Sequence, residues 1–219
     1  MDTPEKFITT GPDGDVAATL LLAHGAGAAM DSRFMNEIAD LLAERQIEVI
    51  RFEFPYMLSR RVTGKRKPAP KAETLKDAFL ATLHEIDDLA RGPLAIGGKS
   101  MGGRVASLIA DQVFAQGKIT SLVCLGYPFH PPGTPEATRT AHLEPLKCPA
   151  LIVQGERDPF GTRAEVEGYT LSQQIALHWL GDGDHDFGPR GASGLTRKGN
   201  LIAAADAVAA FLKGRIVKA

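Results

Sequence analysis

The chain has 219 residues, of which 44% are hydrophobic and 23% are charged, and its formal net charge at pH 7 is −1. This length suits one domain with a substantial core and is short for two, so we expect residues 1–219 to form a single domain. A charge this close to zero gives no electrostatic reason to expect nucleic acid or an anionic membrane as a partner. The sequence has no apolar leader and no apolar run of about 18 residues, which predicts a cytoplasmic protein that does not enter a membrane.

Strand-like and helical segments alternate along the chain. Continuous apolar runs predict strands that are covered on both faces, and apolar residues spaced three or four apart predict helices. The alternation implies βαβ units, and therefore an α/β fold with a mostly parallel central sheet of about six strands and helices on both faces. The predicted strands are 18–23, 47–54, 93–96, 119–125, 150–154 and 175–180, with 5–10 as a candidate edge strand, and the predicted helices are 34–45, 74–91, 201–212 and one that includes 104–110.

Two segments between these elements are expected to be irregular. The stretch 60–71 is basic and contains prolines, which predicts a solvated loop. The stretch 127–146 follows a strand and has four prolines before residue 136. Open α/β sheets build their binding sites at this position, so the segment either walls a pocket or is a plain surface connection. No cap domain interrupts the predicted sheet, which favours a shallow and open pocket.

The run Gly97-Gly98-Lys99-Ser100-Met101-Gly102-Gly103-Arg104 is the most informative part of the sequence. Residues 98–102 fit the G-x-S-x-G pattern, in which a nucleophilic serine occupies a sharp turn between a strand and a helix. Glycine is needed on both sides because the serine takes a strained backbone conformation and a nearby Cβ would clash. The predicted strand before this run and the predicted helix after it supply the required context, so we expect Ser100 to be a nucleophile.

This run has two other interpretations. Gly98-Lys99-Ser100 resembles the end of a phosphate-binding loop, but the first glycine of that motif would fall on Pro93. The alternative alignment on Gly92 and Gly97 places a glycine where the lysine belongs. A glycine-rich turn with only a structural role remains open.

A serine nucleophile needs a histidine base. In this type of site the chain order is serine, acid and then histidine, each at the end of a strand. His185 follows the last predicted strand in a loop that can reach across the top of the sheet, and we expect it to be the base. His130 and His142, in the proline-rich stretch, are the next candidates.

The acid that orients the histidine should follow an earlier strand. Asp158 comes after the predicted strand 150–154, and Pro159 stiffens the turn behind it. Glu156 is the alternative acid. Asp158 could instead cap a helix that begins near Thr162 or stabilise a turn.

Two partial motifs would imply bound groups, and both are incomplete. The alternating aspartates of 182–186 resemble the opening of a calcium loop, but its sixth position is Phe187 and its twelfth is Ser193. Residues 25–30 nearly match a dinucleotide fingerprint but have Met30 in place of the third glycine. We therefore expect no metal and no cofactor.

The oxyanion that forms during acyl transfer needs N–H donors. One should be the backbone N–H of Met101, directly after the nucleophile. The second should come from the H-G-x-G segment 24–27, whose glycines allow the backbone to turn its amides inward. Lys99 and Arg104 flank the nucleophile and could attract an anionic acyl group or form a surface ion pair. Cys124 and Cys148 lie in or beside apolar runs and are expected to be small core residues.

With these residues in place, the chain resembles a small α/β-hydrolase over nearly its whole length. More narrowly, it resembles the compact, dienelactone-hydrolase-like family that also supplies a hydrolase-like domain to a chromatin-associated complex. The resemblance implies Ser100 as nucleophile, Asp158 as acid, His185 as base, and the backbone of Ala26 and Met101 as oxyanion donors. The matching stretches are Leu22-Ala23-His24-Gly25-Ala26-Gly27, Gly97-Gly98-Lys99-Ser100-Met101-Gly102-Gly103-Arg104, Leu125-Gly126-Tyr127-Pro128, Gln154-Gly155-Glu156-Arg157-Asp158 and Gly183-Asp184-His185-Asp186.

The expected function is therefore that of a serine hydrolase, which cleaves a small carboxylic ester or thioester through an acyl-enzyme. The expected partner is a small-molecule substrate, and the sequence does not specify an oligomeric state. Two alternatives stay open. One is a catalytically quiet interaction module with this fold, and the other is an acyltransferase or peptidase.

Overall fold

The computed structural model describes residues 5–214. Within them, seven strands form one sheet in the order β1-β3-β2-β4-β5-β6-β7. Only β1 runs antiparallel to its neighbour, whereas the other strands are parallel. The strands are β1 (Phe7–Thr10), β2 (Ala18–Ala23), β3 (Ile47–Phe52), β4 (Leu94–Lys99), β5 (Ser121–Leu125), β6 (Ala150–Gly155) and β7 (Ile175–Leu180).

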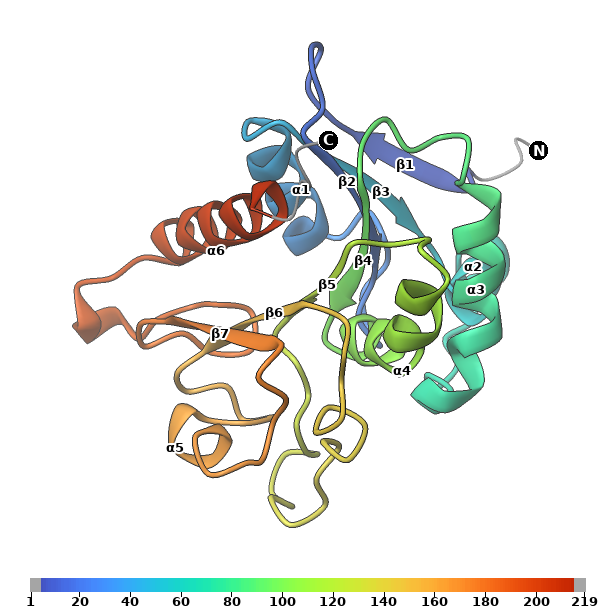
Figure 1. Cartoon of the computed structure of the whole chain (residues 1–219). Coiled ribbons are helices and arrows are strands. Elements are labelled where there is room, and N and C mark those ends of the chain that lie inside the picture. The colour runs from blue at the N-terminus through green and yellow to red at the C-terminus, as the bar shows by residue number, and fades with distance from the viewer. Residues whose placement is uncertain (1–4, 215–219) are drawn as a thin grey trace.

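Helices cover both faces of this sheet, as the sequence predicts. Figure 1 shows α1 and α6 on one side and α2, α3 and α4 on the other. The order of elements is that of a mostly parallel α/β fold, and among residues 5–214 no inserted domain interrupts it. The helices are α1 (Arg33–Ala43), α2 (Pro55–Thr63), α3 (Lys76–Glu85), α4 (Met101–Ala115), α5 (Arg163–Val166) and α6 (Arg197–Lys213), with short 3₁₀ turns η1 (Ala72–Leu75) and η2 (Gly191–Ser193).

The central strands are mostly apolar because they face two cores. Leu20 and Leu22 pack in the core formed with α1 and α6, whereas Leu21 packs in the core formed with α3 and α4. This division follows from the period of two along a strand, which sends alternate side chains to opposite faces. Cys124 and Cys148 are both fully buried in the second of these cores, as predicted.

The structure corrects three expectations. The sheet has one strand more than the six expected, because the edge segment does pair, with Phe7 opposite Phe52. The third strand ends at Phe52, and Pro55 starts α2, so residues 60–63 are helical and not part of a loop. Proline is favoured at the first position of a helix, where its missing N–H is not needed. The helix predicted over 74–91 ends at Glu85.

The strand carboxyl ends carry the loops that matter for function. The loop 24–27 follows β2, and Ser100 follows β4. The stretch 127–146 follows β5, and residues 156–162 follow β6. Binding sites of parallel sheets lie at this edge. No helix within residues 5–214 is long and apolar enough to cross a bilayer.

Candidate active site

Ser100 occupies a sharp turn between β4 and α4, with φ 52° and ψ −117°. Few non-glycine residues adopt such a conformation, and it costs free energy. Crowding around the serine explains the glycines. A Cβ at Gly102 would lie 2.6 Å from the carbonyl oxygen of Ala23, and one at Gly98 would overlap the backbone of Gly102. The segment before the turn is strand β4, so the interpretation as a phosphate-binding loop is wrong.

The structure brings Ser100, His185 and Asp158 into one chain of hydrogen bonds. His185 Nε2 lies 2.9 Å from Ser100 Oγ, and His185 Nδ1 lies 2.8 Å from Asp158 Oδ2. In the tautomer that donates from Nδ1 to the carboxylate, Nε2 is free to accept the serine proton. The Asp158 side chain is fully buried, whereas the His185 side chain remains 21% exposed. This arrangement can activate a serine for nucleophilic attack.

Gln154 is a supporting residue that the sequence analysis did not identify. Its Nε2 donates to Asp158 Oδ2 at 3.0 Å, and its Oε1 accepts from the N–H of Tyr127 at 2.7 Å. The backbone N–H of Phe160 donates to the other oxygen of Asp158 at 2.9 Å. The buried carboxylate is therefore held by donors from three directions. A polar residue near the end of an otherwise apolar strand was the available signal.

Asp158 is the carboxylate that contacts His185, and it also stabilises a turn, because it accepts from the N–H of Phe160 two residues later. Glu156 accepts from Arg163 and from the N–H of Asp182, and it has no contact with His185 among the described residues. The helix α5 is capped by Thr162 with Glu165, not by Asp158.

The other histidine candidates lie elsewhere. His130 Nε2 is 3.4 Å from a carboxylate oxygen of Glu165, and His142 Nε2 is 2.8 Å from Ser107 Oγ. Within residues 5–214, neither imidazole is hydrogen-bonded to Ser100. Burial lowers the pKa of His142 to about 4, with a smaller contribution from the Arg104 cation.

Lys99 is buried beside the loop that carries His185 rather than exposed in a surface ion pair. Its Nζ donates to the backbone oxygen of His185 at 2.8 Å and lies 3.2 Å from Asp186 Oδ1. The ammonium also lies 5.2 Å from the ring centre of Phe34. Burial lowers the pKa of Lys99, and the nearby Asp186 and Asp158 carboxylates oppose this change. Lys99 thus ties the end of β4 to the loop that carries His185.

The loop 24–27 lies beside Ser100, and side chains of α2 hold its carbonyl groups. A Cβ on Gly25 would lie 3.8 Å from the Cβ of Ser100. Tyr56 donates to the carbonyl of Ala26 at 2.9 Å, and Arg60 donates to the carbonyl of Gly27 at 3.2 Å. Among the described residues, the N–H of Ala26 donates to no protein acceptor. Met101 is the first residue of α4, so its N–H has no partner inside the helix.

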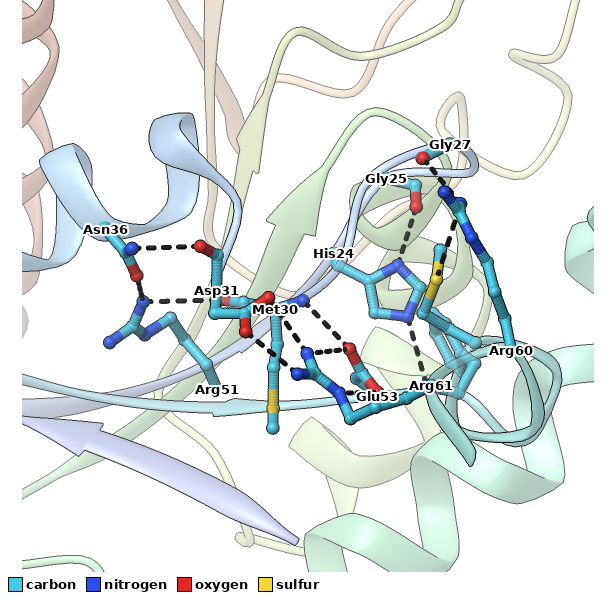
Figure 2. Close-up of polar contacts among 12 residues, drawn as sticks. His24, Gly25, Gly27, Met30, Asp31, Asn36, Arg51, Glu53, Arg60 and Arg61 are labelled. Carbon is cyan, nitrogen blue, oxygen red and sulfur yellow. Dashed lines mark hydrogen bonds and ion pairs between the residues drawn. The ribbon is translucent and has the colours of Figure 1, made fainter. Parts of the chain in front are cut away.

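Figure 2 shows the polar network that anchors this loop and the segment after it. His24 Nδ1 contacts the carbonyl of Gly25 at 2.6 Å, and His24 Nε2 accepts from the N–H of Phe54 at 3.1 Å. The guanidinium of Arg61 lies between Asp31 and Glu53 and donates to both. Because these contacts join the loop to α2 and to the segment between β3 and α2, the backbone next to Ser100 is held in place.

Two clefts of about 550 Å³ each meet at Ser100, and both are bordered by Ala26 and Phe160. The first, here called the histidine cleft, is lined by His185, Lys99, Asp186, Phe34 and Arg33, among others. The second, here called the arginine cleft, is lined by Met101, Arg104, Glu73, Pro128 and Arg139, among others.

Pro128 and Arg139 belong to the stretch 127–146, so this stretch walls a cleft. Within residues 5–214, no group of three or more histidine, cysteine, aspartate or glutamate side chains is arranged to hold a metal ion.

Comparisons with known proteins agree with this fold. The family model described as an alpha/beta hydrolase domain matches residues 16–213. A serine hydrolase homologue from Coxiella burnetii is 18% identical, with 99% of this chain and 95% of that chain covered and a TM-score of 0.66. Dienelactone hydrolase from Anabaena variabilis is 18% identical, with 96% and 93% covered and a TM-score of 0.69. Est1E from Butyrivibrio proteoclasticus, with bound ferulic acid, is 16% identical, with 97% and 95% covered and a TM-score of 0.69.

The support of Asp158 by Gln154 generates a stability prediction. Gln154→Leu keeps the side chain similar in size but removes a donor from a buried carboxylate and leaves the N–H of Tyr127 without its acceptor. Each unsatisfied buried group costs about 1–3 kcal/mol, so the free energy of unfolding should fall by at least that amount. Urea denaturation measures it. Gln173→Leu, at an exposed position, is the matched control and should change stability little; an equal effect of both variants would contradict the assignment.

The low pKa of His142 predicts a pH effect on stability. The unfolded chain protonates this histidine near ~6.5, whereas the folded protein resists protonation down to about pH 4. Unfolding therefore takes up a proton in this window, and stability falls as the pH drops through it. His142→Asn should weaken this pH dependence, as measured by urea denaturation at pH 7 and pH 5. The exposed His84→Asn is the control, and its pH dependence should match that of the parent.

Proposed function

This chain belongs to the alpha/beta hydrolase family whose model it matches, and we propose that it is a serine hydrolase that cleaves a small carboxylic ester or thioester. The observation that carries the proposal is the continuous hydrogen-bond chain from Ser100 through His185 to the buried Asp158. The resemblance of the fold to solved structures that include Est1E and dienelactone hydrolase supports it.

The proposed reaction begins with attack by Ser100 Oγ on the carbonyl carbon of the substrate. His185 Nε2 accepts the serine proton, and Asp158 stabilises the imidazolium through the hydrogen bond to Nδ1. The negative charge that forms on the carbonyl oxygen is stabilised by the N–H groups of Met101 and Ala26.

The tetrahedral intermediate then collapses. His185 donates its proton to the leaving alcohol or thiol, and the acyl group stays on Ser100 as an ester. Water enters, His185 takes one of its protons, and the resulting hydroxide attacks the acyl-enzyme. A second tetrahedral intermediate releases the carboxylic acid, and the proton returns from His185 to Ser100.

Two features favour an active enzyme over a quiet interaction module. The backbone at Ser100 is strained, and such strain persists where the surrounding structure enforces it, most often at functional sites. Asp158 is a buried carboxylate that faces a histidine instead of solvent. Transfer of the acyl group to another acceptor would use the same first half-reaction, and only the second nucleophile would differ.

The first prediction from this proposal concerns the nucleophile. A fluorophosphonate should label the parent protein at Ser100, and Ser100→Ala should abolish both labelling and ester hydrolysis while thermal unfolding stays near that of the parent. Mass spectrometry locates the label.

Ser107→Ala is the matched control, because Ser107 also contacts a histidine but lies away from Asp158; labelling should persist in it. A folded parent that resists a large excess of the probe would favour the interaction module. Thioester cleavage that requires an added alcohol or amine would favour the acyltransferase.

The second prediction concerns Lys99. Lys99→Met keeps the length of the side chain but loses the donor to the carbonyl of His185. Because misplacement by about 1 Å can reduce a rate by about 100-fold, the labelling rate at Ser100 should fall by on the order of 10- to 100-fold. Stopped-time labelling with the same probe measures it. The exposed Lys118→Met should label at the parent rate, and a Lys99→Met protein that does so as well would show that this contact does not position the histidine.

A further inference from the structure

The two clefts that meet at Ser100 have different chemical roles in an acyl transfer. The leaving group must receive its proton from His185, so it must lie on the side of the serine that His185 lines. That side is the histidine cleft. The acyl chain then extends to the other side, into the arginine cleft, which is lined by Met101 and Ser100 but not by His185.

The arginine cleft contains cationic donors that the protein does not use. Arg104 forms an ion pair with Glu73 through Nη2, and its side chain remains 18% exposed at the cleft. The backbone of Arg139 is fixed, because its N–H donates to Phe129 at 2.7 Å and its carbonyl accepts from Tyr127 at 3.0 Å. Its guanidinium donates to no acceptor within residues 5–214. Lys71 adds a third positive charge to the lining, against the single carboxylate of Glu73.

Each cation that lines the histidine cleft is instead paired with a carboxylate. Lys99 is paired with Asp186 and with the carbonyl of His185. Arg33 and Arg197 both donate to the carboxylate of Glu37. Among the described residues, the cations near the serine that lack a carboxylate partner, Arg139 and Lys71, therefore lie on the acyl side. Burial and the neighbouring Arg104 cation lower the pKa of Arg139, which is the expected effect of two like charges placed close together.

We propose that Arg104 and Arg139 bind a carboxylate on the acyl portion of the substrate, so that the substrate is a half-ester or half-thioester of a small dicarboxylic acid. This inference rests on the proposed function, because it assigns the acyl side from the role of His185. Guanidinium groups match a carboxylate by donating two parallel hydrogen bonds. Arg104 follows Ser100 by one turn of α4, about 6 Å along the helix.

The test compares two esters that share a leaving group and differ only in charge. Monomethyl glutarate carries a carboxylate where methyl valerate has a methyl group, and methanol release measures both reactions. The parent kcat/KM should be on the order of 10- to 100-fold higher for monomethyl glutarate, as expected for charge-assisted hydrogen bonds. Arg139→Gln should reduce this ratio towards 1, and Arg104→Gln should reduce it as well.

Arg33→Gln removes the same charge from the histidine cleft and is the matched control. It should keep the preference for monomethyl glutarate. A preference lost in Arg33→Gln and kept in Arg139→Gln would overturn the proposal, because the anion would then lie on the side of the leaving group. The same conclusion would follow if acetoxyacetate, whose carboxylate is on the alcohol side, were preferred to monomethyl glutarate.

Failure of the inference and failure of the proposed function give different results. Equal hydrolysis of both esters, abolished in Ser100→Ala, would leave the serine hydrolase in place and overturn the carboxylate site. If no ester is cleaved, calorimetry of glutarate with the folded Ser100→Ala protein tests the site directly. If glutarate binds to Ser100→Ala and does not bind to the double variant Ser100→Ala/Arg139→Gln, the carboxylate site is supported without the hydrolase function. If glutarate does not bind to Ser100→Ala, the carboxylate site is overturned.

Discussion

The close approach of α4 to the carboxyl ends of β2 and β4 is the constraint on which the rest of the site depends. Gly102 lies so near the carbonyl oxygens of Ala23 and His24, both 2.6 Å from a Cβ placed there, that no side chain fits between helix and sheet. Because the backbones of α4 and β2 are in contact at Gly102, the turn before α4 is sharp and Ser100 adopts a strained conformation. The same contact places the loop 24–27 beside Ser100. Ser100 and the loop 24–27 are thus positioned by one packing contact.

The loop that carries His185 is held in a different way, through buried polar groups. Lys99 holds its backbone, and Asp158 holds the imidazole. Gly155 completes the arrangement, because a Cβ there would overlap the carbonyl oxygens of Gly183 and Asp184. Buried charges are costly unless they are paired and hydrogen-bonded, and here each has such partners. His185 is therefore held by a network of buried hydrogen bonds. Removal of one side chain from this network leaves a buried polar group of its partner without a hydrogen bond.

Charge is distributed unequally around the serine, and this follows from how the elements meet. Cations on the α1 and α6 side find carboxylates on neighbouring helices, as Arg197 does with Glu37. On the other side, Arg104 comes from α4 and Arg139 from the irregular stretch 127–146, and together they have only Glu73 nearby. An open site of this kind can select a substrate by charge without a domain that closes over it.

Local spacing in the sequence predicted the apolar strands and the glycine-flanked turn at Ser100, because these features depend on residues that are neighbours along the chain. The position of Asp158 and His185 after later predicted strands made them candidate partners of this serine. The edge strand was predicted only as a candidate, and the helix that starts at Pro55 was not predicted, since propensity is weak in short segments. Only the tertiary structure revealed that Gln154 supports Asp158, that Lys99 reaches the carbonyl of His185, and that Arg104 and Arg139 line one cleft. Some of these contacts join elements that are separated by long stretches of chain, and the others depend on the direction in which a side chain points. The spacing of residues along the sequence encodes neither property. The packing of the sheet and its helices decides both.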